Sequence, residues 1–464
     1  MPQRIISKTT KVNAILIIAQ LLLVYSIIAK WLEFGCRKGN WVYPYSVKDI
    51  DAPPFILFLV LTPIILILVH LSLRLIEKQK GELPLLFFWL FMGVVFQNAF
   101  RIFYPFSLHD IITSDAANSF YSPTLNYSPY EFLKNFHTLI PLLPLHVRTN
   151  MPGKVLFYYF LKSITDDPQI MGYIIMLFSN AGGLFLYFIT KKLLGGKEAA
   201  FQAFILYLFI PAKIFFLPIL NTVSPFFILS DFFLFLIFLE NQKKRFAFIL
   251  GVLLYVTFLF EPLPMGSGIL FIGLLLNNLI RREIDLREII GMVLYVILGF
   301  LSLYFLVYIF FGLDTMKAFI YILKDLQDFF VRARREYTIW IFHNLKEFIV
   351  TAGFSLSLLF LFNISCLFSY KKGELKGIDR GGQPQPVSGD FVTVSFLFLL
   401  IIIDLLGMNR GEVTRLWIFM ASFLPIIAVD YLSKLDGKSP FYVCLGGLFL
   451  QIVVSISLVG FVIP

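Results

Sequence analysis

Long apolar segments recur along the whole chain, and they constrain its fold more than any other feature of the sequence. A membrane-spanning helix needs about 20 mainly apolar residues, because each residue advances ~1.5 Å through a hydrocarbon core of ~30 Å. By this measure the chain of 464 residues holds about thirteen spans. We expect them at residues 13–31, 54–74, 85–104, 168–190, 198–216, 221–240, 246–262, 264–280, 288–311, 347–369, 391–407, 415–432 and 440–461.

The composition excludes a water-soluble globule of this size. Hydrophobic residues make up 58% of the chain and charged residues only 15%, whereas soluble domains carry about 25% charged residues. Too little polar surface would remain to cover a soluble core of this composition. The sequence therefore predicts an all-α polytopic membrane protein whose outer-face loops carry short interfacial helices.

Basic residues alternate along the chain in step with the predicted spans. If the N-terminus is cytoplasmic, every connection on the cytoplasmic side is basic, as the positive-inside rule requires. These connections contain Arg74, Lys78 and Lys80; Lys191, Lys192 and Lys197; Lys243, Lys244 and Arg245; Arg281, Arg282 and Arg287; Lys371, Lys372, Lys376 and Arg380; and Lys434 and Lys438. The pattern predicts a multi-pass protein of a prokaryotic cytoplasmic membrane with its C-terminus outside. The net charge of +10 then reflects topology, and we expect no nucleic-acid partner.

Connection lengths suggest how the chain is organised. We expect residues 1–370 to form one transmembrane module with long outer loops at 105–167 and 312–346. Residues 371–390 are rich in glycine, proline and charge, which is typical of a flexible linker, here cytoplasmic. Residues 391–464 supply the C-terminal transmembrane helices.

The outer loop at 105–167 concentrates side chains suited to group transfer. A carboxylate at the membrane surface can act as a general base toward a sugar hydroxyl, and arginine or lysine can hold a phosphate. For Asp115 the alternative is that it caps a helix, because Ser114-Asp115-Ala116-Ala117 is a good N-terminal signal. The candidate residues are Asp110, Asp115, Tyr121, His146, Arg148 and Lys154.

Two further clusters carry charge on the outer side. Arg332, Arg334 and Arg335 follow a segment whose spacing predicts an amphipathic interfacial helix, which contacts lipid headgroups or docks a lipid-borne anion. Glu412 and Arg415 are spaced to pair on one helix face.

Charges at the mouth of a span are expected to face a cavity. Arg410 lies beside the Glu412–Arg415 pair, and Glu261 at another outer turn is a candidate for the same cavity. A structural salt bridge and a contact with phosphate or acceptor are both consistent with this pattern.

Several segments resemble the GT-C glycosyltransferases, polytopic enzymes that use lipid-phosphate-linked sugars and include protein O-mannosyltransferases and aminoarabinose transferases. SDAANSFYSPTL looks like their acidic first-loop motif, HVRTNMPGKVLFYYFL like the segment before a membrane helix, and MNRGEVTRLWIFM like a later outer-loop motif. SNAGGLFLYFITKKLLGGKEAAFQAFILYLFIPA and NTVSPFFILSDFFLFLIF are similar to the intervening helices. The resemblance covers most of 85–245 and a short C-terminal patch. Asn150 and Met151 stand where the family segment has His and Pro.

The resemblance implies a GT-C-like fold and an inverting hexosyl- or pentosyltransferase of the cell envelope. It would move a sugar from a polyprenyl-phosphate donor to a glycan, lipid or protein acceptor on the extracytoplasmic face. Asp115 would be catalytic, with Asp110 as a second candidate. The donor phosphate would contact Arg148, Lys154, Arg332, Arg334, Arg335 or Arg415, and the acceptor or cavity would involve Glu412, Arg410, Tyr121, His146 and Glu261.

Some relatives of this kind use a divalent metal. The oxygen ligands Asp115 and Asp110 would suit Mg²⁺ or Mn²⁺. A transporter or flippase for lipid-linked saccharides, or a polysaccharide polymerase or ligase, remains an alternative function. As a geometric test, we expect Asp115, Arg148 and Arg415 to line one outer-facing cavity.

Overall fold

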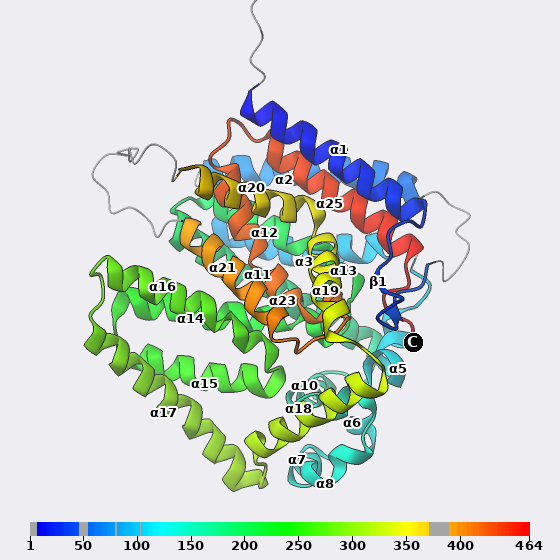
Figure 1. Cartoon of the computed structure of the whole chain (residues 1–464), viewed down its shortest axis with the longest axis vertical. Coiled ribbons are helices and arrows are strands. Elements are labelled where there is room, and N and C mark those ends of the chain that lie inside the picture. Colours follow the sequence, from blue (N-terminus) through cyan, green and yellow to red (C-terminus); the bar gives the residue numbers. More distant parts are fainter. Residues whose placement is uncertain (1–6, 46–53, 79–80, 103, 371–388) are drawn as a thin grey trace, which may run out of the picture.

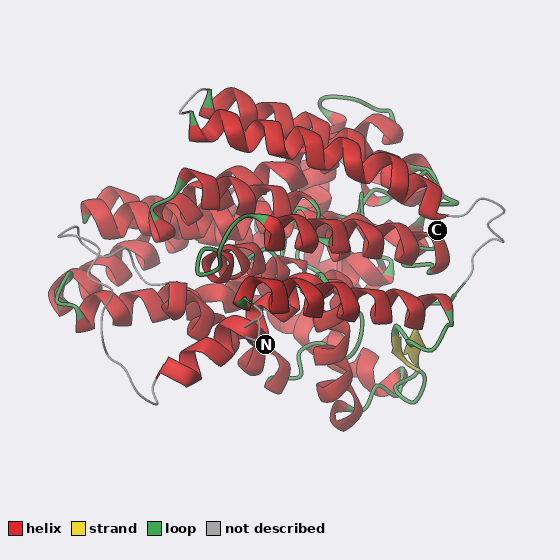
Figure 2. Ribbon diagram, turned by 90° about the horizontal axis from the view of Figure 1, so that it is seen from above, coloured by secondary structure: helices red, strands yellow, loops and turns green. Residues whose placement is uncertain are grey.

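The computed structural model describes residues 7–45, 54–78, 81–102, 104–370 and 389–464, and they are almost entirely helical (Figures 1 and 2). Two short strands, β1 (Gly35–Cys36) and β2 (Trp41–Val42), pair antiparallel. Tyr45 also forms an isolated bridge with Val459, which brings the first connection beside the end of the chain. The predicted linker at 371–390 lies outside the described residues up to 388, and the next helix begins at Gly389.

Three long helices precede the first long loop. They are α1 (Lys8–Ile28), α2 (Pro54–Glu77) and α3 (Glu82–Phe100). The loop at 105–167 then folds into a series of short helices, as predicted for an outer loop with interfacial helices. These are α4 (Leu108–Thr113), α5 (Asp115–Asn118), α6 (Pro123–Asn126), α7 (Pro129–Lys134), α8 (Phe136–Leu139), η1 (Ile140–Leu142), α9 (Leu145–Arg148) and α10 (Gly153–Lys162).

The middle of the chain returns to long apolar helices. They are α11 (Pro168–Leu194), α12 (Lys197–Leu208), α13 (Pro211–Phe215), η2 (Leu220–Thr222), α14 (Ser224–Asn241), α15 (Lys244–Phe260), η3 (Leu263–Ser267), α16 (Gly268–Ile280) and α17 (Leu286–Phe311). The remaining helices are α18 (Thr315–Arg332), α19 (Tyr337–Thr351), α20 (Phe354–Tyr370), α21 (Gly389–Leu405), α22 (Val413–Leu416), α23 (Ile418–Ala421), α24 (Leu424–Leu432) and α25 (Ser439–Leu458).

The chain is a polytopic membrane protein by the length and apolarity of its helices. Among the described residues, nine helices are long and apolar enough to cross a membrane, or ten if the bent pair α19–α20 counts as one span. This is fewer than the thirteen predicted. Helices α15 and α21 have 17 residues each, at the lower limit for a span, and the predicted span 415–432 is divided among α22, α23 and α24.

Local sequence accounts for the breaks that the apolar pattern did not reveal. The predicted helix 347–369 bends by 108° between α19 and α20, where Gly353 has φ +111°, a conformation that only glycine adopts readily. Pro211 and Pro425 each lie in the first turn of a new helix, where proline needs no N–H partner. Continuous hydrophobicity therefore does not imply a continuous helix.

The C-terminal helices pack among the earlier ones. Helix α25 contacts α1, α2 and α13, helix α24 contacts α12 and α20, and α21 contacts α16. Figure 1 shows α25 running beside α1 and α2. Residues from both sides of the predicted linker therefore share one hydrophobic core.

Three of the basic turns, those after α2, α11 and α24, lie together at one end of the bundle, as their alternation along the chain predicts. Glu82 at the start of α3 lies 2.5 Å from Lys191 and 3.1 Å from Lys197, and Lys192 lies 2.6 Å from Glu240. Lys438 pairs with Glu77 and, at 2.9 Å, with Glu198. We call this the basic end.

The opposite end carries the short helices of the loop at 105–167, helix α18, the small sheet and the C-terminus. Figure 1 shows β1, α5 and the C-terminus on the right and α6, α7, α8, α10 and α18 towards the bottom. Lys346 of α19 donates to the backbone carbonyls of Glu33 and Gly35, each at 2.8 Å. Trp340 Nε1 donates to Gly39 O at 3.1 Å. We call this the loop-bearing end.

Candidate functional site: a cationic cavity at the loop-bearing end

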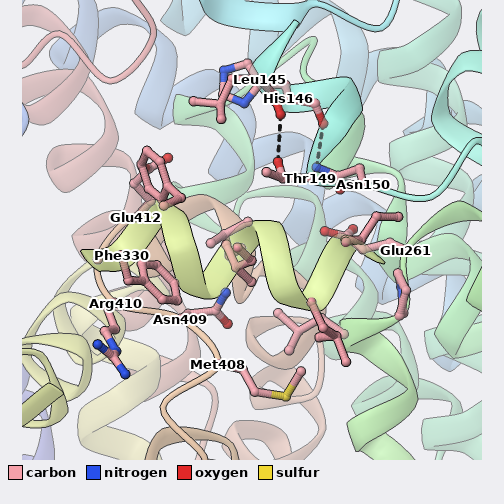
Figure 3. Close-up of a pocket in the computed structure, with 18 of the residues that line it drawn as sticks. Leu145, His146, Thr149, Asn150, Glu261, Phe330, Met408, Asn409, Arg410 and Glu412 are labelled. Atoms are coloured by element: carbon pink, nitrogen blue, oxygen red, sulfur yellow. Dashed lines mark hydrogen bonds between the residues drawn. The ribbon is translucent and has the colours of Figure 1, made fainter. Parts of the chain in front are cut away.

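A cavity of about 910 Å³, partly open to solvent, lies at the loop-bearing end. Its walls come from α9 and the two residues after it, the turn after α15, helix α18, Arg335, and the connection from α21 to α22. In Figure 3, His146, Thr149 and Asn150 lie at the top of the view and Met408, Asn409 and Arg410 at the bottom, with α18 crossing between them.

Helix α18 supplies an apolar wall. Asp314 caps its N-terminus by accepting hydrogen bonds from the backbone of Met316 and Lys317, at 3.1 and 3.0 Å. Its cavity face then repeats at helical spacing, with Phe319, Ile322, Leu323, Leu326, Phe329 and Phe330. The amphipathic helix predicted for this segment is confirmed, and its apolar face looks into the cavity.

The connection before α22 is held in an unusual backbone shape. Gly411 has φ +88°, and a Cβ there would lie 2.8 Å from the ring of Trp340, so no larger residue fits without movement. Asn344 donates to Asn409 O at 2.9 Å and accepts from Gly411 N at 3.2 Å. Glu412 itself has φ +60°, a strained region for a residue other than glycine. The neighbouring helices thus position this connection against the cavity.

Glu412 forms the centre of an ionic cluster. Its Oε1 lies 2.9 Å from Arg335, and its Oε2 pairs with Arg415. Burial by itself would raise the pKa of Glu412, but Arg415 and Arg335 outweigh this effect and lower the pKa to about 2. Glu412 therefore remains a carboxylate at neutral pH.

The side chains of Arg335 and Arg410 each donate a hydrogen bond to the backbone carbonyl of the other residue. Arg335 is 5% exposed and donates to Arg410 O at 3.0 Å, while Arg410 donates to Arg335 O at 3.1 Å. The guanidinium of Arg335 lies 4.9 Å from the ring centre of Trp41, and that of Arg410 lies 5.1 Å from that of Phe330. Stacking on aromatic faces stabilises both cations.

The three arginines retain unused donors. In Arg335, Arg410 and Arg415 the Nε atom is buried and has no hydrogen-bond partner among the described residues. A buried donor without a partner is costly. Because Arg335, Arg410 and Arg415 all line the cavity, an anion bound there would meet three guanidinium groups. Arg335 and Arg415 share the carboxylate of Glu412, and Arg410 pairs with no carboxylate among the described residues, so positive charge is in excess.

Glu261 borders the same cavity, but both of its carboxylate oxygens already have partners within the protein. Its Oε1 lies 3.1 Å from Lys154 Nζ and accepts from Asn221 at 2.6 Å, and its Oε2 accepts from Ser224. Lys154 is 1% exposed and also donates to Asn150 Oδ1 at 3.2 Å. Burial lowers the pKa of Lys154, and Glu261 opposes this shift. Each charge in this pair is balanced by its partner.

His146 is the remaining ionisable side chain of the lining. Its Nε2 lies 3.0 Å from Ala116 O of α5. Burial, and next the charge of Arg415, lower the pKa of His146 to about 4. The imidazole is therefore neutral at pH 7.

The structure brings together six of the residues predicted for the site. Arg335, Arg410, Arg415, Glu412, His146 and Glu261 all line the cavity. The Glu412–Arg415 pair predicted from spacing is also present. Lys154 lies behind the lining through its pair with Glu261.

Three predicted phosphate ligands, Arg148, Arg332 and Arg334, and the predicted cavity residue Tyr121 lie outside the lining. Arg148 pairs with Asp325 at 2.9 Å, and Arg332 lies 3.6 Å from the same carboxylate. Arg334 is exposed, and the ring of Tyr121 packs 5.8 Å from that of Tyr158. The expectation that Asp115, Arg148 and Arg415 line one cavity is wrong for Asp115 and Arg148, because Arg148 is drawn to Asp325 and Asp115 points to the surface.

The two aspartates of the first loop occupy helix starts. Asp110 accepts from the backbone N–H of Ser107 at 2.9 Å in a capping box, and hydrogen bonds from Ser107 lower its pKa. Asp115 is exposed in the first turn of α5, where Ser114 is the cap. Ala116, the next residue, contacts His146, so Asp115 is close to the cavity in sequence without lining it.

The aspartates do not form a metal site. In the described ranges no three His, Cys, Asp or Glu side chains are placed to hold a metal ion. The Asp110 carboxylate is already used by the backbone of Ser107. We therefore derive no step through Mg²⁺ or Mn²⁺.

Sequence reasoning did not anticipate several residues that shape the cavity. Trp41 comes from the first connection and stacks on Arg335. Asn344 and Trp340 of α19 support the connection at 406–412, and Asp325 removes Arg148 from the site. These contacts join segments far apart in the chain, and the only local signal was the GMNRG sequence with its two glycines.

Neither a protein-family model nor a curated protein matches this sequence. The resemblance to GT-C enzymes therefore stays a prediction from short motifs.

Proposed function

We propose that the chain is a membrane-embedded glycosyltransferase of the GT-C type. It transfers a sugar from a polyprenyl-phosphate donor to an acceptor at the loop-bearing end. The observation that carries this proposal is the cavity itself, which is lined by three arginines and by an apolar wall of α18. A ligand with an anionic head and a hydrocarbon tail would place its head against the arginines and its tail against the apolar face of α18.

The chemistry of the cavity suits departure of a phosphate. Arg335, Arg410 and Arg415 hold the phosphate and stabilise the charge that develops on it as the bond to the sugar breaks. Glu412 keeps two of these guanidinium groups in place. Phe319, Leu326 and Phe330 contact the isoprenoid and exclude water from the reacting centre.

The orientation of the protein follows from its charges. The basic end carries Lys191, Lys192, Lys197 and Lys438, and basic connections favour the cytoplasmic side. We place the loop-bearing end, with the cavity, on the extracytoplasmic face of the cytoplasmic membrane.

A flippase for lipid-linked saccharides would bind the same headgroup. Such a protein needs a path for the headgroup past the bilayer midplane. The polar cluster of Gln97, Asn180 and Lys213 within the spans is fully buried, and Asn180 Oδ1 accepts from both partners at 2.7 Å. A fully buried cluster of this kind leaves no passage for a headgroup, which favours the enzyme.

The proposal is tested by sugar transfer in proteoliposomes. The purified chain is mixed with radiolabelled decaprenyl-phosphate-linked mannose, glucose or aminoarabinose and with acceptor membranes. We expect transfer of at least one sugar into a glycosidic product, with Arg410→Met reducing it and Arg334→Met, an exposed matched control, leaving it unchanged. Movement of donor across the bilayer without a new glycosidic product would support the flippase instead.

A further inference from the structure

Both carboxylates that line the cavity are unavailable as proton acceptors. Glu412 is paired through each oxygen with an arginine. Glu261 accepts from Lys154 and Asn221 on one oxygen and from Ser224 on the other. A carboxylate whose lone pairs are directed at cations and donors is a weak base. The acceptor hydroxyl must therefore pass its proton to another group.

His146 offers a free lone pair in the same lining. Its Nε2 lies 3.0 Å from Ala116 O, and a backbone carbonyl can only accept, so Nε2 carries the hydrogen. In the neutral ring the other nitrogen, Nδ1, is then an acceptor. Nδ1 has no hydrogen-bond partner among the residues that the structure describes and is not among the buried atoms lacking one, so solvent or a ligand can reach it.

Burial and the charge of Arg415 keep His146 neutral in the free protein, ready to accept a proton. Burial and then Arg415 lower its pKa to about 4, Glu412 and the Ala116 carbonyl raise it, and Lys154 lowers it further. A phosphate bound at Arg415 would offset the charge of that cation. The proton affinity of His146 therefore rises when the site is loaded, which brings a general base closer to its useful range.

We propose that His146 is the proton acceptor of the transfer reaction. This inference rests on the proposed function and assigns to His146 the role that the sequence predicted for Asp115. The acceptor hydroxyl gives its proton to Nδ1 while its oxygen bonds to the anomeric carbon. The bond from that carbon to the phosphate oxygen breaks, and its electron pair leaves with the polyprenyl phosphate held by the arginines.

The decisive variant is His146→Gln, tested in the transfer assay described above. The amide N–H of glutamine can still donate to Ala116 O, but its oxygen is a far weaker base than imidazole. We expect transfer to fall at least about 100-fold, the usual contribution of a general base, while affinity for farnesyl phosphate stays within about threefold of the parent. In His146→Ala, added imidazole should restore part of the rate.

His137→Gln is the matched control. His137 lies in the same loop, where its Nε2 accepts from the backbone of Asp314 at 3.2 Å, and it does not line the cavity. Its substitution should leave transfer within about twofold of the parent.

The outcomes separate this inference from the function on which it rests. If the parent transfers sugar and His146→Gln does so at a similar rate, His146 is not the acceptor although the enzyme stands. If His146→Gln loses farnesyl phosphate binding together with transfer, and imidazole does not restore His146→Ala, the role of His146 is structural and the inference is wrong. If the parent forms no glycosidic product from any donor, both proposals fall.

Discussion

Two glutamates border the same cavity, and their surroundings differ in one respect. Glu261 is bonded to one cation, Lys154, and to two neutral donors, Asn221 and Ser224. Glu412 is bonded to two cations, Arg335 and Arg415, with Arg410 beside them. The first cluster is balanced and saturated, whereas the second has excess positive charge and three Nε donors without a partner in the described residues.

This difference distinguishes a structural cluster from a binding cluster. Buried ionic groups that pair fully with each other serve the structure and leave no donor or acceptor free for a ligand. Buried cations with donors to spare are destabilising until an anion arrives. Lys154 and Arg335 are both buried cations, but Arg335 lines the cavity and Lys154 lies behind it, paired with Glu261.

The largest effect is expected from breaking the saturated cluster. Lys154→Met leaves the Glu261 carboxylate buried without its cation, which should lower the free energy of unfolding by about 3–5 kcal/mol. Denaturant unfolding in detergent micelles measures this loss. Lys154→Met combined with Glu261→Gln should recover part of it, and unchanged stability in the single variant would show that the pair is not structural.

Arg410→Met tests the binding cluster with a smaller effect. Arg410 forms no ion pair with a described carboxylate, so its removal leaves no buried anion exposed to desolvation. We expect affinity for farnesyl phosphate to fall about 10- to 100-fold, as for the loss of a hydrogen bond to a charged group, with stability nearly unchanged. If Arg410→Met instead lost stability and kept its affinity for farnesyl phosphate, the Arg410 cluster would be structural, like that of Glu261.

The pH dependence of sugar transfer tests the role of His146 as the proton acceptor. Its pKa in the free protein is depressed to about 4 by burial and Arg415, so the neutral, proton-accepting form predominates above that pH and is lost as pH falls through it. We expect kcat/KM for transfer to decline about tenfold per pH unit below about pH 4. The residual activity of His146→Gln should lack this limb, and the same limb in both proteins would assign the titration to another group.

The smallest effect is expected at Asp115. This side chain is exposed at the start of α5 and does not line the cavity, so Asp115→Asn should transfer sugar within about threefold of the parent. A loss of about 100-fold in a well-folded variant would restore Asp115 as the catalytic base. Measuring Asp115→Asn and His146→Gln in one assay compares the two candidates directly.

Much of the fold could be predicted because apolar length and charge are local properties. The helices and the gathering of Lys191, Lys197 and Lys438 at one end follow from segments of the chain read one at a time. Breaks such as that at Gly353 could not be predicted in the same way, because an apolar run looks alike whether it is straight or bent.

The site could be predicted only where partners are close in sequence. Glu412 and Arg415 are three residues apart, and their pair was expected. Arg148 and Asp325 are not, and their pairing at 2.9 Å moved Arg148 out of the site. Residue type identified cations that can bind phosphate, but which of them are neutralised depends on tertiary contacts that no local pattern encodes.

The most direct test of the account compares farnesyl phosphate with farnesol as ligands of the purified chain. The two molecules share a hydrocarbon tail and differ in the anionic head that the Arg335–Arg410–Arg415 cluster should recognise. We predict at least about tenfold tighter binding of farnesyl phosphate, with this preference largely lost in Arg410→Met and retained in Arg334→Met. Equal affinity for the two ligands in the parent protein would contradict the assignment of the cavity as a lipid-phosphate site.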